Sequence, residues 1–360
     1  MTQSDRMLPA TQDFSFYTSS EYYEHITEAI KRTESGDRVL LMSLWIRAHE
    51  APIEAMLKAA IAAADRGVKV TLIVDAFTFL IKSGVKPGPA FYFGASSKYM
   101  PKVFQERLAM LDQIQKAGGR YAVINQPKRA FRNPFQGRSH IKFTVVNDEI
   151  FVGGCNLSNT NFLDVMVGWH NSTIADWLAG LAEKIMRTGN VAAALEGHDV
   201  RLSVDAHTDL VIDAGVPDQS LILEEALAMI AQARKKLLIT FQYCPQGPTA
   251  NALHEAHDRG VKLEAIYNHP GKHGAPLNIV FGGLAWYASR GRSAQLRAGR
   301  LTKQHNYLHA KIIATEHGAI LGSHNYMPPG VRLGTAEIAL VSRDPSFADR
   351  ASETLRRQLS

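Results

Sequence analysis

The sequence has little cysteine and no apolar run long enough to span a membrane. Cys155 and Cys244 are the only cysteines among 360 residues, too few and too far apart for a disulfide framework or a cysteine-built zinc site. The apolar run VTLIVDAFTFLI has 12 residues and contains Asp75, whereas a helix needs about 20 apolar residues to cross a bilayer. The N-terminus MTQSDRMLPATQDF lacks the basic start and apolar stretch of a secretory signal. These absences predict a cytoplasmic protein whose contact with the inner membrane face is peripheral.

The composition is that of an ordinary globular protein, with 46% apolar and 21% charged residues and no low-complexity tract. A chain of 360 residues suffices for roughly two domains. The net charge of +6 favours an anionic partner. Charge alone leaves nucleic acid, an acidic lipid surface and a phosphorylated substrate open.

The sequence contains an internal repeat. DRGVK occurs at 65–69 and again at 258–262. A helix is predicted over 51–64, because apolar residues recur there at helical spacing. Apolar runs at 39–46 and 237–244 precede the two copies, and β-rich segments follow them, so each unit is predicted to be strand, helix, strand with parallel pairing.

This repeat predicts an α/β fold of two pseudo-symmetric α/β/α halves with mixed, largely parallel sheets. The halves are predicted to comprise residues 1–190 and 191–360.

Each half carries one copy of a motif with three polar residues. The two copies consist of His140, Lys142 and Asn156, and of His309, Lys311 and Asn325. A glycine follows each histidine by 13 residues. Residues i and i+2 of a strand point to the same face, so the histidine and lysine of each copy are predicted to lie side by side. A short hairpin would return the asparagine to them.

An imidazole, an ammonium and a carboxamide from each half would together enclose a tetrahedral anion. Lysines and amides stabilise charge on the non-bridging oxygens of a phosphoryl group, while one histidine attacks phosphorus and the other protonates the leaving oxygen. This chemistry requires no metal and no cofactor.

Other interpretations of the motif residues are weaker. A single HxK pattern is common and carries little information. Two copies with the same spacing from histidine to glycine make the motif specific. His305 and His309 have the spacing of a zinc-binding helix, but LHAKIIA favours a strand and no third ligand is in register, so no metal site is predicted. Cys155 lies inside the first motif as either a nucleophile or a small buried apolar residue, and the second interpretation is favoured.

The duplicated HxK followed by GG/GS-x-N resembles the phospholipase D superfamily, over about residues 35–345. The order of neighbouring segments is most similar to its cardiolipin synthase-like branch. The resemblance implies a phospholipase D-like fold with one active site at the interface of the halves, and a phosphohistidine intermediate. It makes His140 the nucleophile and His309 the general acid, with the motif lysines as phosphate clamps and the motif asparagines as amide donors.

The resemblance extends to two acidic residues and fails at one position of the motif. Asp164 and Glu337 match family carboxylates, which implies that each holds the opposing imidazole in one tautomer and raises its pKa. The family usually has an Asp five residues after the lysine, where this chain has Asn147 and Glu316. That Asp usually supports the hairpin, so the departure predicts a local structural variation, with Asp148 as a candidate replacement after a one-residue shift.

An aromatic-rich insertion distinguishes the first half. Seven of the 28 residues at 77–104 are aromatic. Rings interleaved with lysines suit an interfacial loop, so Phe91, Tyr92 and Phe93 are candidates to bind lipid at an anionic membrane, with a place in the core as the alternative. Arg138 is a further candidate to bind substrate.

The resemblance implies phosphodiester transfer on a phospholipid, by a phosphatidyltransferase or a phospholipase D. A metal-independent nuclease is an alternative, because basic residues precede both motifs. These residues are Arg129, Arg132, Arg138, Arg290, Arg292, Arg297, Arg300 and Lys303. A phosphate- or membrane-binding protein without activity is a third possibility, against which the intact histidines and lysines argue. The acceptor and the oligomeric state stay open at this stage.

Overall fold

The computed structural model describes residues 11–48, 50–79, 102–126, 133, 135–158, 161–243, 245–268, 301 and 305–359. Some residues named above lie outside these ranges: Phe91, Tyr92, Phe93, Arg129, Arg132, Cys244, Arg290, Arg292, Arg297, Arg300 and Lys303.

In the N-terminal half, the described residues form a seven-stranded sheet with the first motif hairpin near its centre. The strand order is β1 (Ser15–Thr18), β7 (Val165–His170), β6 (Glu149–Gly153), β5 (Phe143–Val146), β2 (Arg38–Ser43), β3 (Lys69–Asp75) and β4 (Arg120–Ile124).

In the C-terminal half, the seven strands of the described residues repeat most of this succession. Their order is β11 (Lys262–Tyr267), β10 (Lys236–Phe241), β12 (Ile312–Thr315), β13 (Gly318–Gly322), β14 (Glu337–Ser342), β9 (Thr208–Asp213) and β8 (Val200–Ser203). Read from β9 to β11, the order matches that from β1 to β3, so the internal repeat of the sequence is a repeat of topology.

The helices of the described residues cover the outer faces of the sheets and fill the space between them. They are α1 (Ser19–Lys31), α2 (Ala51–Asp65), α4 (Lys102–Lys116), α5 (Ser172–Thr188), α6 (Val191–Ala194), α7 (Leu221–Gln232), α8 (Gly247–Asp258), α10 (Pro328–Arg332) and α11 (Pro345–Arg356), with a 3-10 turn at Ala76–Phe79. The helix predicted over 51–64 is α2, with proline in its first turn. None of the helices within the described ranges has the length and apolar character needed to cross a membrane.

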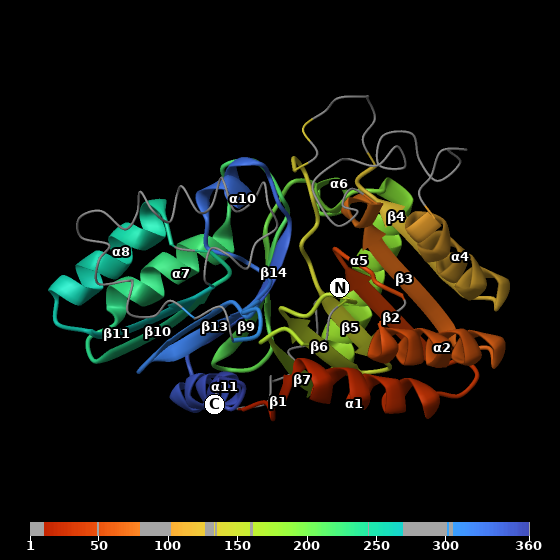
Figure 1. The fold of residues 1–360 in the computed structure, drawn as a ribbon, viewed down its shortest axis with the longest axis horizontal. Coiled ribbons are helices and arrows are strands. Elements are labelled where there is room, and N and C mark those ends of the chain that lie inside the picture. The colour runs from red at the N-terminus through yellow and green to blue at the C-terminus, as the bar shows by residue number, and fades with distance from the viewer. Residues whose placement is uncertain are drawn as a thin grey trace, which may run out of the picture.

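The two halves share one hydrophobic core. Figure 1 shows them side by side, the first from red to yellow-green and the second from green to blue. One buried cluster includes β2 and β5 from the first sheet, β12 and β14 from the second, and α5 and α11. Separate clusters lie under α1 and α2 in the first half and under α7 and α8 in the second. The sheets are therefore held together by apolar burial between them.

The fold is confirmed as two α/β halves with mixed sheets, but not as largely parallel. β2 and β3, joined by α2, are parallel, as are β10 and β11, joined by α8, which confirms the strand, helix, strand prediction. β3 and β4 are parallel as well, and the other pairings between the strands named above are antiparallel. The prediction of largely parallel sheets is wrong because each motif folds into a hairpin followed by a third antiparallel strand, which short connections allow.

Candidate active site

Each motif histidine lies in an extended segment that runs beside the other half. The His140 amide donates to the Ala336 carbonyl at 2.8 Å, and the His309 amide donates to the Leu163 carbonyl at 2.9 Å. These two segments then enter β5 and β12, so the histidine and lysine precede the strand instead of lying within it. The first hydrogen bond places His140 beside Ala336, the residue before Glu337. The second places His309 beside Leu163, the residue before Asp164.

Each imidazole is bonded to that carboxylate. His140 Nδ1 lies 2.9 Å from Glu337 Oε2, and His309 Nδ1 lies 2.6 Å from Asp164 Oδ2. The acceptor fixes the proton of each neutral ring on Nδ1, so Nε2 is the nitrogen through which each ring can act on a substrate. The ring centroids are 6.4 Å apart, and all four side chains are buried. The structure thus brings together the histidines and carboxylates singled out in the sequence.

The motif lysines are buried beside the histidines. Lys142 Nζ donates to the His140 carbonyl at 2.7 Å, and Lys311 Nζ donates to the His309 carbonyl. Burial lowers the pKa of both ammonium groups, to about 8 for Lys311. An ammonium has three N–H donors, so each lysine can also donate to a bound oxyanion.

The imidazoles are neutral near pH 7 in the protein without substrate. Burial, then the charge of Lys142, lowers the pKa of His140 well below its usual value. Burial, then Lys311, lowers the pKa of His309 to about 3, although Asp164 acts in the opposite direction. The expectation that the carboxylates raise the imidazole pKa is wrong as a net effect, because it left out the cost of burying a charge.

The motif asparagines occupy equivalent places after β6 and β13. Asn156 Oδ1 accepts a hydrogen bond from the Ser43 hydroxyl at 3.5 Å. Asn325 Oδ1 is buried without a hydrogen-bond partner in the part of the chain that the structure describes. A buried acceptor without a donor costs about 1–3 kcal/mol, which a substrate hydroxyl could relieve.

The glycines of the motifs allow close approach of neighbouring strands. A Cβ at Gly154 would lie 2.0 Å from Asp164 Oδ1, the oxygen that also accepts from the Val165 amide at 3.0 Å. A Cβ at Gly322 would lie 2.2 Å from the Ile338 carbonyl. Gly154 is therefore needed for the position of Asp164, and Gly322 for the close approach of β13 and β14.

A buried network of hydrogen bonds behind the first motif was not predicted from the sequence. Asp75, at the end of β3, accepts from Arg138 Nη1 at 3.0 Å, from the Ser139 amide at 2.7 Å and from Asn125 Nδ2 at 2.7 Å. Arg138 Nη2 also donates to the Asn125 carbonyl at 2.8 Å. These bonds make Arg138 a support for the segment that carries His140, and its role as a substrate ligand stays a prediction.

Asn268 is the counterpart of Asp75 in the second half. Asn268 Oδ1 accepts from the Leu308 amide at 2.8 Å, and Nδ2 donates to the Leu308 carbonyl at 2.7 Å. Both residues come six positions after the lysine of DRGVK. A polar residue directly after a buried strand, at the same offset in both copies, is the signal that could have found them.

An aromatic contact at His309 was also missed. The Phe162 ring is stacked on the His309 ring, with centroids 5.6 Å apart and an interplanar angle of 29°. The Tyr307 ring lies 4.9 Å from Phe162. Phe162 therefore covers one face of the imidazole, and Tyr307 packs against Phe162.

The residues at the family's Asp position support both hairpins. Asn147 Oδ1 accepts from the Arg38 amide at 3.1 Å, at the start of β2. The Glu316 carboxylate accepts from three consecutive amides at 234–236, at 2.7, 3.0 and 3.2 Å, at the start of β10. The proposed replacement by Asp148 is wrong, because Asn147 makes this bond itself and the Asp148 side chain is half exposed.

Cys155 is a buried free thiol. Its Sγ lies 3.4 Å from Ser19 Oγ, and burial raises its pKa well above the usual range. A neutral thiol is a poor nucleophile, which agrees with the apolar interpretation. Within the described ranges, no group of three or more His, Cys, Asp or Glu side chains is arranged to hold a metal.

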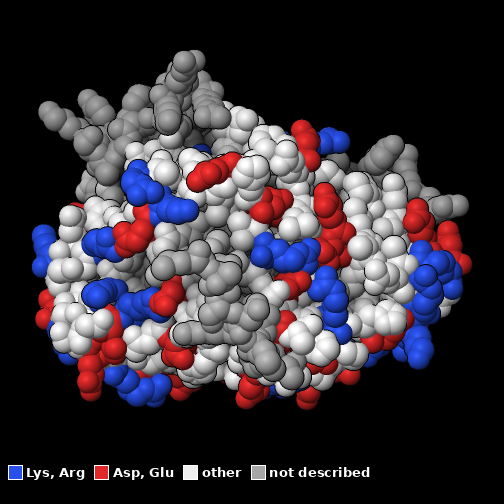
Figure 2. Space-filling view, turned by 180° about the vertical axis from the view of Figure 1, so that it is seen from behind, with Lys and Arg blue, Asp and Glu red and all other residues white. Residues whose placement is uncertain are grey.

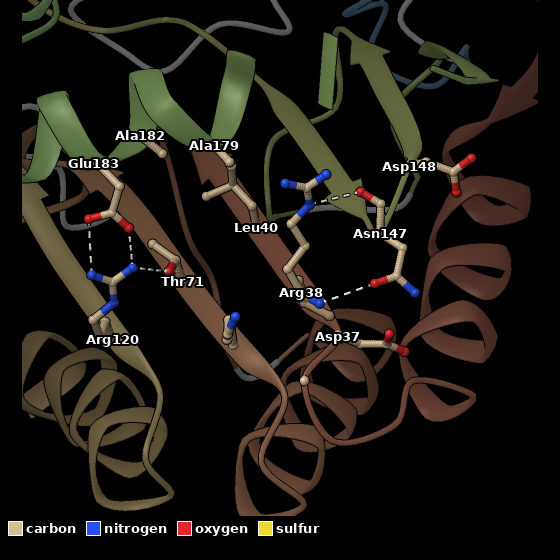
Figure 3. A pocket seen from close by; sticks show the side chains of 13 residues that line it. Asp37, Arg38, Leu40, Thr71, Arg120, Asn147, Asp148, Ala179, Ala182 and Glu183 are labelled. Carbon is tan, nitrogen blue, oxygen red and sulfur yellow. Dashed lines mark hydrogen bonds and ion pairs between the residues drawn. The ribbon is translucent and has the colours of Figure 1, made fainter. Parts of the chain in front are cut away.

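A pocket of about 500 Å³ lies at the other end of the strands (Figure 3). It opens where β2, β3 and β4 begin, whereas the motif histidines lie beyond the ends of β2 and β3. Its two arginines are already paired, Arg120 with Glu183 and Arg38 with Asp176 at 2.6 Å, and Lys69 also lines it. We assign this pocket no part in the chemistry of the imidazoles.

The surface charge of the face shown in Figure 2 is mixed. Lys and Arg alternate there with Asp and Glu among the described residues, instead of gathering in a field of one sign. The basic residues expected to follow a nucleic acid backbone lie outside the described ranges, apart from Arg138.

A sequence model of the family described as "Cardiolipin synthase, PLD-like domain" matches residues 26–186 and 226–359. The chain belongs to this phospholipase D-like family. The match covers most of both halves and includes all six residues of the two motifs. No sequence among curated proteins matches the chain significantly.

Solved structures support the same fold for this PLD-like chain. Phosphatidylserine synthase from Haemophilus influenzae Rd KW20 matches 98% of the chain over 88% of its own length, at 15% identity and a TM-score of 0.69. Polyphosphate kinase from Porphyromonas gingivalis matches 97% of the chain over 50% of its own length, at 13% identity and a TM-score of 0.56. The phospholipase D family member Nuc from Salmonella typhimurium matches 48% of the chain over 91% of its own length, at 16% identity and a TM-score of 0.31. At these identities, the likeness to the synthase and the kinase is one of fold.

Proposed function

We propose that this PLD-like protein transfers a phosphatidyl group from a phospholipid to a hydroxyl acceptor, through a covalent phosphohistidine. The observation that carries the proposal is the pair of buried imidazoles, each bonded through Nδ1 to a carboxylate of the other half and each accompanied by a buried lysine. Two acid–base groups and two cations converge there, which is what displacement at a phosphodiester requires.

In the first step, His140 Nε2 attacks phosphorus and forms a P–N bond while the bond to the leaving alcohol breaks. His309 gives a proton from Nε2 to the leaving oxygen. Lys142 and Lys311 stabilise the charge on the non-bridging oxygens, and Glu337 stabilises the charge that develops on His140.

In the second step, His309 takes a proton from the acceptor hydroxyl, whose oxygen attacks phosphorus and breaks the P–N bond. Water as the acceptor gives hydrolysis, and an alcohol gives transfer. His309 must carry a proton in the first step although its pKa is about 3 in the protein without substrate. A bound phosphodiester anion offsets the nearby lysine charges and raises that pKa.

The family description and the composition of the insertion favour a lipid substrate. The matching family is described as cardiolipin synthase-like, and the insertion carries Phe91, Tyr92 and Phe93 next to lysines. Burying one such ring at an interface contributes about 1.5–3 kcal/mol, so a few rings suffice to hold a protein on a bilayer.

The test is to incubate the protein, in a buffer with EDTA, with phosphatidylglycerol vesicles and separately with single-stranded DNA. We expect lipid turnover without metal, detected as a new phospholipid or as phosphatidic acid, and no cleavage of DNA. Turnover that is lost in EDTA and restored by zinc or magnesium contradicts the mechanism. Cleavage of DNA alone replaces the lipid proposal by the nuclease alternative, and no reaction with either substrate favours a binding protein.

A triple substitution of Phe91, Tyr92 and Phe93 by Ser separates lipid binding from chemistry. We expect loss of vesicle binding and lipid turnover, while hydrolysis of a small soluble phosphodiester persists. A parallel loss of both activities and of thermal stability would place these rings in the core.

A further inference from the structure

The strand register makes positions around the two carboxylates equivalent. In each half, the glycine that ends the second hairpin strand pairs with the residue two positions after the carboxylate. Asp164 and Glu337 are therefore equivalent, and Cys155 in the first half is equivalent to His324 in the second. The family motif leaves the identity of this last position open, so its chemistry is a property of this chain.

His324 begins a buried chain of hydrogen bonds. The Tyr326 amide donates to His324 Nδ1 at 2.9 Å, which assigns the ring proton to Nε2. Nε2 lies 3.5 Å from Ser220 Oγ, and Ser220 Oγ donates to Asp213 Oδ2 at 2.6 Å. All of these residues are buried. The chain runs in one direction from an imidazole through a hydroxyl to a carboxylate.

Both ends of this chain lie next to Glu337. Asp213 pairs directly with Glu337 in the register of β9 and β14. Ser323, the neighbour of His324, donates from its hydroxyl to the Glu337 carboxylate that holds His140. Glu337 has one more rotatable bond than an aspartate, so it needs these additional contacts to keep one orientation.

The equivalent positions behind Asp164 carry no ionised group. Cys155 Sγ lies 3.4 Å from Ser19 Oγ, and Ser19 Oγ donates to the Phe162 carbonyl at 3.0 Å. The register of β1 and β7 ends at Thr18 opposite Val165, so the next residue, Ser19 at the start of α1, follows on the side of Asp164, where the second half has Asp213 opposite Glu337. A thiol and a hydroxyl thus stand where the other half has an imidazole and a carboxylate.

We propose that His324, Ser220 and Asp213 are positioning residues that hold Glu337 against His140 and couple its charge to the ionisation of Asp213, so that the two pseudo-symmetric imidazoles are not equal. That this difference assigns the two imidazoles to different catalytic steps rests on the proposed function. It concerns the histidine bonded to Glu337, whichever step that histidine performs.

The charges around Asp213 support coupling near neutral pH. Burial raises the pKa of Asp213 to about 7, and the carboxylates of Asp199 and Glu337 act in the same direction. The Ser220 hydroxyl and the Ile222 amide, bonded to Asp213 at 2.6 and 3.0 Å, oppose this shift. Asp213 therefore gains its negative charge as the pH rises through about 7.

The charges around Glu337 carry this change to the site. Burial raises the pKa of Glu337 to about 6, and His324, Lys142 and Lys311 act against that shift. Burial lowers the pKa of His324 to about 4, so this ring is neutral when Asp213 ionises, and it contacts Asp213 through Ser220. His140 is bonded to Glu337 and senses any change in it.

The experiment uses the full chain and three variants: Asp213→Asn, His324→Asn and the control Cys155→Ser. Asn at 213 carries no charge and keeps one acceptor oxygen, for the Ile222 amide, while its NH2 group faces Ser220 as a donor. Asn at 324 keeps an acceptor for the Tyr326 amide but does not reach Ser220. The ring signals of His140 and His309 are followed by NMR between pH 5 and 9 without substrate. The rate of phospho-enzyme formation from an activated soluble phosphodiester is measured over the same range.

We expect an inflection near pH 7 in the His140 signal that Asp213→Asn and His324→Asn abolish and Cys155→Ser retains. His309 should show no such inflection. His324→Asn should also slow the step that uses His140 by about 10- to 100-fold, the order of effect of a displaced reacting group, with KM unchanged. Equal changes in both rings, a wild-type profile in both variants, or the same loss in Cys155→Ser overturns the proposal.

The NMR titration needs no substrate, so it tests the network of Asp213, Ser220 and His324 independently of the proposed function. A protein that turns over no phosphodiester but shows the His140 inflection contradicts the function and keeps the network. An active protein without the inflection contradicts the network alone.

Discussion

At the scale of single residues, the space beside Asp164 is as important as its charge. Gly154→Ala would place a methyl carbon 2.0 Å from Asp164 Oδ1 and displace the carboxylate that holds His309. We expect a kcat lower by about 10- to 100-fold and a loss of about 1–3 kcal/mol in the free energy of unfolding. The measurements are steady-state kinetics and urea unfolding.

Gly180→Ala is the matched control, because a Cβ at this position in α5 meets no atom within 4 Å. An alanine there should keep full activity and stabilise the helix by up to about 1 kcal/mol. A wild-type kcat in Gly154→Ala would contradict the prediction, because it would mean that catalysis does not depend on the position of the Asp164 carboxylate.

Lys311 should set the alkaline limit of substrate capture. Burial lowers its pKa to about 8, so it loses its positive charge as the pH rises through that value. We expect kcat/KM, which reports the free enzyme, to fall above about pH 8, and kcat to persist to higher pH, because a bound phosphate anion raises the pKa of the ammonium. A kcat/KM that stays flat to pH 10 would contradict the role of Lys311 as a phosphate clamp.

The sequence predicted which residues of the candidate site come together better than it predicted their ionisation. The HxK spacing and its duplication identify His140 and His309, since the pattern depends only on chain order. The depressed pKa of both rings depends on burial, and burial follows from the meeting of two halves far apart in the chain. Asp75 was visible as a polar residue after an apolar strand, yet its bond to the Ser139 amide requires knowledge of which loops meet.

At the scale of elements, Glu316 joins the second motif hairpin to the start of β10. Its carboxylate accepts three backbone amides, and they lower its pKa to about 2. Because the folded pKa lies below the unfolded one, this stabilisation is full above about pH 4.5 and is lost as the pH falls toward 2. We expect Glu316→Ala to destabilise the protein by about 1–3 kcal/mol at pH 7 and by less at pH 3, measured by urea unfolding.

Glu316→Gln is the comparison for this prediction, since it keeps an acceptor oxygen and removes the charge. It should retain part of the stability, and its difference from wild type should shrink as the pH falls. An equal loss at both pH values would mean that packing of the side chain, and not its charge, is the cause.

The elements themselves were largely predictable where a local pattern determines them. α2 was predicted from its apolar spacing, and the parallel pairs β2–β3 and β10–β11 from the strand, helix, strand order. The hairpin of β5 and β6 was expected from the motif, but the antiparallel addition of β7 was not, because its direction depends on the path of a longer loop that no local pattern determines. The geometry of the hairpin turn was not predicted either, since Asn147 adopts a positive φ of 57° there.

At the scale of the whole molecule, α11 connects the C-terminal half to the first strand of the chain. Phe347 of α11 is buried, and its ring lies 5.2 Å from Phe14 and 4.9 Å from Phe16. Gln358, just beyond α11, accepts from the Asp164 amide at 3.2 Å and donates to the Asp164 carbonyl at 3.0 Å. The end of the chain therefore supports the core between the halves and the residue that holds His309.

We expect Phe347→Ala to lower the free energy of unfolding by about 3–5 kcal/mol, because it removes a ring from the shared core. Three of the four tryptophans, Trp45, Trp169 and Trp177, belong to the first half, whereas the substitution is in the second. If the halves unfold as one unit, tryptophan fluorescence and far-UV circular dichroism will shift together by the same amount. Phe241 lies in the core of the second half alone. If the whole molecule unfolds cooperatively, Phe241→Ala should also shift the fluorescence midpoint and the circular dichroism midpoint by the same amount. Fluorescence that keeps its wild-type midpoint in either variant would show that the first half is stable alone, and the active site would then depend on two independently folding units.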